Sequence, residues 1–334
     1  MKLLLFFILI TSAVSFSSCV NQKANKTKEG TPLEMASLAI DKNPDNPELY
    51  MKRAELYEKK MDLNNAIVDV QKAIQLDNKN YDNYIKLADL FLASNQIQGS
   101  ISILNSVLLN EPKNVNANLK MAELSLMFKR YTNTIKSANA VLEADPYNAK
   151  AFFIKGFAFK EYGDTTKAIQ SFIEAIKNNP KYYEANVEIG NLFRSKKDPI
   201  AITYYQSAIN IDPTKTDSYY NLALFYQQND MLNKAQDTYR KLIELDPKFP
   251  YSYFNMGYIL LEISRTPDEA APYFAKAIEQ KPDYYEAHYN LGLCLEEMGD
   301  LRNAAESYKN ALKYYNNYPK AIEGLNRIDE LMKR

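Results

Sequence analysis

A period of 34 residues constrains this chain more than any other feature. A small residue recurs at this spacing along most of its length: Ala66, Ser100, Thr134, Ala168, Ala201, Ala235, Ala270 and Ala304. A proline or asparagine follows each of them at a fixed distance: Asn78, Pro112, Pro146, Pro180, Pro213, Pro247, Pro282 and Asn316. Both series are spaced 34, 34, 34, 33, 34, 35 and 34, so they share one register and slip at the same two places. This pattern indicates one unit repeated eight times.

The unit is a pair of helices, seen most clearly in residues 216–249. Helical spacing puts apolar side chains on one face of its first half: Tyr219, Leu222, Ala223 and Tyr226. Asn229-Asp230 is turn chemistry, and a second apolar helical face follows: Ala235, Tyr239, Leu242 and Ile243. Pro247 then ends the second helix, because proline lacks a backbone N–H. One such hairpin cannot cover its own apolar face, so the repeats must stack.

From Pro47 to Tyr318 the chain resembles the tetratricopeptide repeat family. The family's close-packing small residue is matched in every repeat: Ala54, Ala88, Ala122, Gly156, Gly190, Ala223, Gly257 and Gly292. Asn118, Asn186 and His288 depart from the large first-helix residue that is usual in the family. The resemblance implies an all-α fold, a right-handed α-solenoid of tetratricopeptide helical hairpins. We attribute the 33-residue spacing to a shortened turn near 195–199 and the 35-residue spacing to an extra residue near 264–267.

The expected organisation has a leader, a tether, eight hairpins and two caps. Residues 1–18 are predicted to be a lipoprotein signal peptide, 19–30 a lipidated Cys and flexible tether, and 31–46 an N-terminal half repeat. The eight repeats are expected at 47–80, 81–114, 115–148, 149–182, 183–215, 216–249, 250–284 and 285–318. Residues 319–334 are predicted to form a C-terminal capping helix, since repeat arrays need polar end caps.

The N-terminus has the layout of a secretory signal. Lys2 precedes an apolar run at 3–10 and small residues at 15–18, directly before Cys19. This resembles the bacterial lipobox, which implies lipidation at Cys19. The alternatives are an uncleaved anchor, or an ordinary signal with an incidental Cys. The resemblance implies an exported protein, lipid-anchored to a bacterial membrane, and the absence of an acidic residue after Cys19 favours the outer membrane facing the periplasm.

Composition argues against several other functions. With 41 basic and 41 acidic residues the chain is not a nucleic-acid binder by charge. No cluster of His, Cys and carboxylates has metal-ligand spacing, so we expect no metal, no cofactor and no enzyme. His288 stands at a core place, and Cys294 faces away from it along the helix.

A stripe along the first helices could bind a partner. In the family the first helices line a concave groove, and one inner stripe of this chain begins with Lys52, Lys86 and Lys120, which would suit acidic groups. It ends with Asn221, Asn255 and Asn290, whose amides could bond any peptide backbone. The alternatives are that the lysines are ordinary solvated surface and that the asparagines are a general feature of the family.

Aromatic and apolar side chains accompany this stripe. The candidates are Phe153, Phe157, Tyr220, Phe254, Tyr258 and Tyr289, with the amide of Asn191. Further aromatic residues stand at the hairpin junctions: Tyr182-Tyr183, Tyr251 and Tyr284-Tyr285. If they face one hollow they form an aromatic channel, and if not they pack against the next helix.

These observations predict a non-catalytic protein–protein interaction scaffold. It would capture an extended peptide or a helix of a partner in its groove and support assembly of an envelope complex. The alternative is a glycan-capturing lipoprotein of a nutrient-uptake system, because aromatic rings also stack on sugars. The absence of Trp counts against that alternative.

Overall fold

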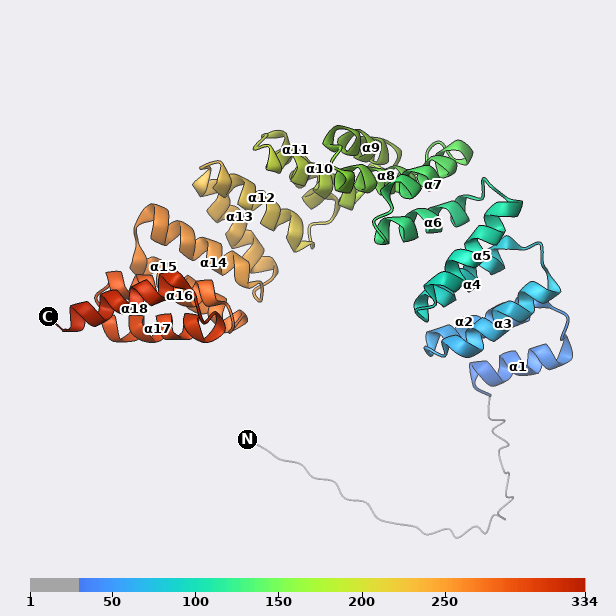
Figure 1. Cartoon of the computed structure of the whole chain (residues 1–334), viewed down its shortest axis with the longest axis horizontal. Helices are drawn as coiled ribbons and strands as arrows, with labels where there is room; N and C mark the ends of the chain where they lie inside the picture. The colour runs from blue at the N-terminus through green and yellow to red at the C-terminus, as the bar shows by residue number, and fades with distance from the viewer. Residues whose placement is uncertain (1–29, 334) are drawn as a thin grey trace, which may run out of the picture. The chain divides into compact units, whose positions relative to one another are not determined.

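The computed structural model describes residues 30–333, which are all-α, with no strand among them (Figure 1). The chain forms two compact units, one ending at Ser100 and one beginning at Ile101, and each is described by itself. The predicted all-α fold of helical hairpins is confirmed, while its right-handed winding stays a prediction. No helix within residues 30–333 has both the length and the apolarity needed to cross a bilayer.

The first unit holds a lone helix and the first hairpins. Its helices are α1 (Pro32–Lys42), α2 (Pro47–Lys59), α3 (Leu63–Leu76) and α4 (Tyr81–Ala93), and α5 (Ile97–Asn110) contains the boundary between the units. Thr31 and Glu34 form a capping box at the start of α1, so this helix begins where its own sequence dictates. Ile40 of α1 packs with Tyr50 of α2 and Ala73 of α3, which covers the first hairpin.

The second unit continues the hairpins to a final single helix. Its helices are α6 (Val115–Met127), α7 (Tyr131–Ala144), α8 (Ala149–Tyr162), α9 (Thr165–Asn178), α10 (Tyr183–Ser195), α11 (Ile200–Ile211), α12 (Thr216–Gln228), α13 (Leu232–Leu245), α14 (Pro250–Tyr258), η1 (Ile259–Ser264), α15 (Pro267–Gln280), α16 (Tyr285–Glu297), α17 (Leu301–Tyr314) and α18 (Pro319–Met332). Every second helix, from α3 to α17, ends two residues before the recurring Pro or Asn. Proline cannot continue a helix and restricts the residue before it, which explains this stop.

Each hairpin turns on one residue in the left-handed backbone conformation. These residues are Met61, Asn95, Lys129, Gly163, Lys197, Asp230, Arg265 and Gly299. They form a third series with the repeat period, parallel to the small-residue series and the proline or asparagine series of the sequence. Lys197 precedes Ala201 by one residue fewer than its counterparts precede theirs. The missing residue therefore lies in the turn after Lys197, inside the segment that the sequence indicated.

The extra residue of the seventh repeat lies elsewhere than predicted. Arg265 follows the close-packed Gly257 by eight residues, where the other repeats have seven. Between them, Ile259–Ser264 forms a π-helical turn, η1. The insertion is thus absorbed inside the first helix. The π-helical turn overlaps the predicted segment 264–267 only at Ser264, so the extra residue was predicted a few residues too far along the chain. A π-helical turn accommodates one added residue without breaking the helix, which explains the placement.

The two helices of a hairpin match in side-chain size at their closest approach. A Cβ on Gly190 would lie 2.6 Å from the Tyr205 ring, and one on Gly292 would lie 2.6 Å from Tyr308. Gly156 and Gly257 meet phenylalanine rings in the same way. In the first and third repeats the equivalent places hold Ala54 with Val70 and Ala122 with Ala138, all fully buried. Glycine therefore stands mainly where the facing residue is aromatic; Ala223 facing Tyr239 is the exception.

A hydrogen bond back to the preceding loop fixes the start of many first helices. The phenols of Tyr50, Tyr84 and Tyr253 donate to the carbonyl six residues earlier, at 3.0, 3.3 and 3.1 Å. Asn118 donates to the equivalent Pro112 carbonyl at 2.9 Å, and His288 Nε2 lies 3.0 Å from the Pro282 carbonyl. Two residues that depart from the usual aromatic type thus make the same contact as tyrosine.

Candidate functional site

Aromatic rings of the sixth and seventh repeats form one connected group, which we name the Tyr251 cluster. Its members are Tyr220, Phe249, Tyr251, Phe254, Tyr258 and Tyr284. Tyr220 lies 5.2 Å from Phe249 and 6.2 Å from Tyr251, measured between ring centroids. Tyr251 meets Tyr284 at 5.5 Å, Tyr284 meets Phe254 at 4.9 Å, and Phe254 stacks on Tyr258 at 6.5 Å. The helices α12 and α14 and the loops that follow α13 and α15 therefore build one aromatic face.

Two smaller groups flank this cluster along the chain. Phe153 of α8 lies 5.4 Å from Phe157 and 4.8 Å from Tyr182. Tyr289 of α16 lies 5.3 Å from Tyr318, which in turn lies 5.1 Å from Tyr285. The six inner aromatic candidates, Phe153, Phe157, Tyr220, Phe254, Tyr258 and Tyr289, thus each belong to one of three groups.

The inner aromatics differ in how far they are packed into the hairpin cores. Phe153 also packs 5.5 Å from Phe172, and Tyr220 lies 6.5 Å from Tyr239, so these rings contribute to the hairpin core. Tyr258 keeps 39% of its surface exposed. Tyr258 directly precedes the π-helical turn η1, and such turns occur frequently at functional sites. Tyr258 is thus the exposed ring of this cluster, and Phe254 stacks on it.

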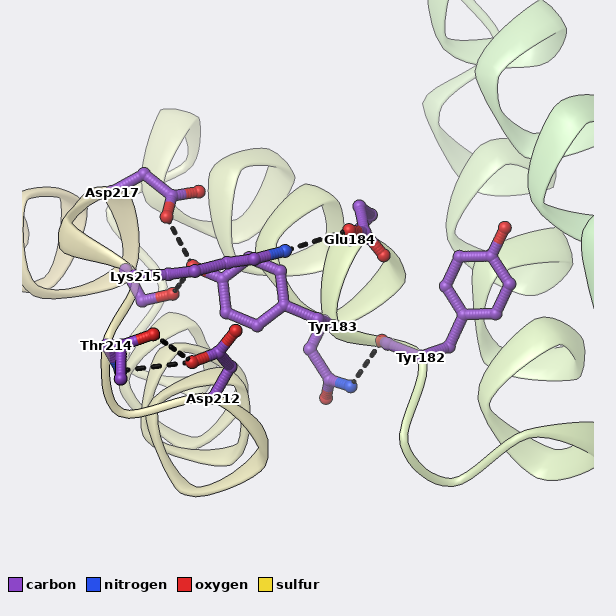
Figure 2. A network of polar contacts seen from close by, with 9 residues as sticks. Tyr182, Tyr183, Glu184, Asp212, Thr214, Lys215 and Asp217 are labelled. Atoms are coloured by element: carbon purple, nitrogen blue, oxygen red, sulfur yellow. Dashed lines mark hydrogen bonds and ion pairs between the residues drawn. The ribbon is translucent and has the colours of Figure 1, made fainter. Parts of the chain in front are cut away.

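The tyrosine pairs at the junctions divide between different neighbours. Figure 2 shows Tyr182 and Tyr183 pointing to opposite sides of the chain. Tyr182 joins Phe153, and burial raises the pKa of its phenol to about 12. The Tyr183 hydroxyl instead bonds Asp217 and Ser218 of the next repeat. Of the two alternatives left open for the junction aromatics, this pair shows packing against different neighbours, because adjacent residues at a helix start face different elements.

The Tyr183 contacts join the fifth repeat to the sixth (Figure 2). Lys215 places its ammonium 4.0 Å from the Tyr183 ring centroid and 3.1 Å from Glu184. Burial and the hydrogen bond to Asp217 raise the pKa of Tyr183. This network has a structural role, since its polar groups form hydrogen bonds and ion pairs with one another between the two repeats.

Lys281 is a site residue that the sequence analysis missed. Its ammonium lies 4.8 Å from the Tyr284 ring centroid and 5.2 Å from that of Tyr251, and donates to the Tyr251 hydroxyl at 3.2 Å. Most repeats place an acid or amide here, as Asp246 does when it accepts the Lys248 N–H at 3.0 Å. The replacement of that acid by lysine is the signal that could have identified it. Lys281 holds two rings of the Tyr251 cluster together.

Asn221, Asn255 and Asn290, which we name the asparagine ladder, have less accessible surface than expected. Asn255 and Asn290 are buried, and Asn290 donates to the Glu286 carbonyl of its own helix at 2.8 Å. Asn221 is half-buried. Asn191 is also half-buried and accepts a hydrogen bond from Tyr205 at 2.9 Å. Peptide binding by these amides stays a prediction, with Asn221 as the most accessible member of the ladder.

The lysine stripe is not a row of free cations. Lys86 binds Glu58 at 2.5 Å, and Lys120 also has an interaction partner. Only Lys52 is exposed, next to Glu48 and Glu55 in a shallow hollow. Lys86 is less exposed than Lys52 because it pairs with an acid of the neighbouring repeat. Lys160 and Glu188 occupy the equivalent places of later repeats with the charges exchanged, and they pair at 2.9 Å.

The remaining reactive side chains have packing roles. His288 is buried and stacks on Tyr314 at 5.6 Å, besides its contact with Pro282. Burial raises the pKa of the Cys294 thiol to about 12, so it carries little thiolate at neutral pH. Within residues 30–333 no three His, Cys, Asp or Glu side chains gather as metal ligands. Cys19, the predicted lipidation site, lies outside the described residues.

Comparison with known proteins identifies the repeat. Family models described as tetratricopeptide repeat match residues 60–124, 149–182, 216–249 and 254–322. The chain belongs to the tetratricopeptide repeat family. Its fold is also similar to the crystal structure of the C-terminal part of a tetratricopeptide repeat-containing protein from Cytophaga hutchinsonii, with a TM-score of 0.63 and 22% identity, covering 72% of this chain and 99% of that one.

Curated relatives match this tetratricopeptide chain over part of its length. It is 29% identical over 99 residues to the general transcriptional corepressor ssn6 of Schizosaccharomyces pombe, covering 29% of this chain and 9% of that protein. It is 26% identical over 172 residues to the Hsp70-Hsp90 organizing protein of Triticum aestivum, covering 51% of this chain and 24% of the relative. The chain thus spans less than a quarter of either relative. The family and the aromatic face together support a protein–protein interaction scaffold.

Proposed function

We propose that this protein captures a segment of a partner polypeptide on the Tyr251 cluster and holds it close to a bacterial membrane. The observation that carries the proposal is the exposed Tyr258 ring, stacked on Phe254 and continuous with four further aromatic rings. Aromatic side chains are enriched at protein interfaces, where they contribute large contact areas at low cost in conformational entropy. Either an extended peptide or one face of a helix fits such a surface.

Capture is passive in this proposal. The rings of the cluster are held by mutual contacts and by Lys281, so the face is formed before a partner arrives. A preformed face loses little conformational freedom on binding. The described residues supply packing and hydrogen bonds to a partner, and the proposed activity includes no chemical step.

The membrane part of the proposal comes from Cys19. Acylation of this residue after removal of residues 1–18 would tether the array, and several acyl chains on one residue bind stably where one is marginal. Mass spectrometry of the mature chain tests it: an N-terminal Cys19 carrying acyl groups is expected, and Cys19→Ser should release the protein from membranes. A mature chain that begins elsewhere would remove the anchor from the proposal while leaving the capture site untouched.

The capture site is tested by crosslinking in cells. A photo-crosslinking residue at Tyr258 is expected to trap one predominant polypeptide, and the same residue at Tyr147, which is exposed outside the cluster, is the matched control. Tyr251→Ser should abolish the product from position 258. Equal products from both positions would contradict the proposal. Saturable heat on titration with oligosaccharides, with none for the trapped polypeptide, would favour the glycan-capturing alternative.

A further inference from the structure

The turns of the third to fifth repeats, in the second unit, combine exposed basic and exposed apolar side chains. The third turn carries Lys129 and Arg130, and the fifth carries Lys196 and Lys197, all four exposed. Among residues 30–333 none of these cations has an ion-pair partner. Two nearby acids are paired with cations: Asp164 with Lys167 at 2.8 Å, and Glu161 with Lys160 at 3.8 Å. Asp198 keeps its charge and accepts the Ile200 N–H at 3.0 Å, so the four unpaired cations outnumber it.

Large apolar side chains stand beside these cations. Phe128 is 42% exposed, Tyr162 at the fourth turn is 70% exposed, and Ile200 after the fifth turn is 47% exposed. None of them belongs to the clusters described above. Their exposure at successive turns is not required by the hairpin, since the turn of the sixth repeat has Asn229 and Asp230 instead.

These turns lie along one edge of the second unit. Residues 129–133 and Tyr162 line one hollow of ≈ 270 Å³, which places the third turn next to the fourth. Lys160 of α8 binds Glu188 of α10 at 2.9 Å, so the fourth and fifth repeats are in contact. Stacked repeats place their equivalent turns along one edge, so we infer that the fifth turn follows the fourth there. We name the side chains of Phe128, Lys129, Arg130, Tyr162, Lys196, Lys197 and Ile200 the basic edge.

We propose that the basic edge docks on the surface of an anionic lipid bilayer. Lysine and arginine are attracted to anionic headgroups, and aromatic and aliphatic side chains beside them enter the headgroup region. The side chains project from turns, so their tips can reach a broad surface without a complementary pocket. Charge complementarity therefore favours a membrane, and an acidic protein is the alternative that the test must exclude.

This inference is separate from partner capture, because the basic edge shares no residue with the Tyr251 cluster. It complements the proposed anchor without depending on it. A tether alone leaves the orientation of the array free, whereas edge contact would fix which side faces the bilayer.

The test uses the full chain with Cys19→Ser, which prevents acylation there. A polarity-sensitive fluorophore is placed at Phe128→Cys, with Tyr147→Cys as the control position; Cys294 is buried and stays unlabelled in the folded protein. Vesicles of phosphatidylcholine with about one-third phosphatidylglycerol are added, and pure phosphatidylcholine vesicles are the neutral arm. A blue shift at position 128 with anionic vesicles, and none at position 147, is expected.

Charge reversal completes the test. Lys129→Glu with Arg130→Glu should weaken binding to anionic vesicles about tenfold or more, because each cation near the surface contributes to attraction. The matched control is Lys181→Glu with Lys248→Glu, which makes the same change in net charge at exposed lysines outside the basic edge and should leave binding nearly unchanged. Circular dichroism verifies folding of both. No shift at position 128, equal effects of the two double variants, or a larger shift with polyglutamate than with vesicles would overturn the proposal.

Discussion

His288 places Nε2 3.0 Å from the carbonyl oxygen of Pro282, the same contact that Tyr253 makes with Pro247 one repeat earlier. The single histidine of the chain therefore anchors a helix start to the loop before it. Its burial and its stacking on Tyr314 complete a packing role.

This relationship predicts the outcome of a substitution series at residue 288. His288→Tyr should retain nearly all the stability, because tyrosine makes this bond in three other repeats. His288→Ala should lower the free energy of unfolding by about 1–3 kcal/mol through loss of the bond and of packing. His288→Phe should fall between them. Urea denaturation measures the series, and an alanine variant as stable as the tyrosine variant would contradict the assigned role.

Ser252 offers a route to a more stable protein. Its hydroxyl is fully buried in α14 and has no hydrogen-bond partner among the described residues. Ser252→Ala should raise the free energy of unfolding by about 1 kcal/mol, since an unsatisfied buried polar group is costly. The control is Ser218→Ala at the equivalent place of the preceding repeat, where the hydroxyl contacts Tyr183. That variant should lose stability in the same melting experiment, and a loss in both would exclude the explanation.

The close approach of Gly190 to Tyr205 predicts a size-compensated pair. Gly190→Ala would put a Cβ 2.6 Å from the ring and should cost about 1–3 kcal/mol, as overpacking of a core does. Replacing Tyr205 with Leu in the alanine variant should recover part of this loss, because the equivalent places of the first repeat hold Ala54 and the aliphatic Val70, both fully buried. A double-mutant cycle measures the coupling, and additive effects would show that the two positions do not compete for space.

Buried tyrosines predict the response of this protein to alkaline pH. Burial raises the pKa of Tyr182, Tyr205 and Tyr318 from the ordinary value of 10.0 to about 12. Above pH 10 the folded state thus binds more protons than the unfolded state, so stability falls as pH rises from about 10 to about 12. Tyrosinate absorbance should lag behind that of free tyrosine and then rise together with loss of helical circular dichroism. Full ionisation at pH 11 with the helices intact would contradict the burial of these phenols.

The hairpins were predictable from the sequence because the small-residue series and the proline or asparagine series constrain each repeat independently. The repeat period alone could not predict where an inserted residue lies or which way a junction side chain points. The extra residue between Gly257 and Ala270 could lie in the helix or in the turn, and only the structure places it in η1. The two directions taken by Tyr182 and Tyr183 depend on their neighbours, which periodicity does not specify.

The site was predictable as a set of rings but not as a surface. Helical spacing identified Tyr220, Phe254 and Tyr258 on consecutive first helices. It could not show that Asn255 and Asn290 are covered, since burial depends on the neighbouring repeats. Lys281 was not predicted, because a lysine after a helix is common in sequences. Its role becomes evident only when the Tyr251 and Tyr284 rings are seen next to its ammonium.

The residues at the closest approach of the two hairpin helices differ between the early and the late repeats. The first and third repeats have small aliphatic residues at this approach, whereas four of the last five have an aromatic ring packed on glycine. In a linear array each repeat depends on its immediate neighbours, so weak and strong segments can come apart separately. Aromatic rings bury more apolar area than small aliphatic side chains, so under a pulling force we expect the hairpins of the first and third repeats to open before those that carry the Tyr251 cluster.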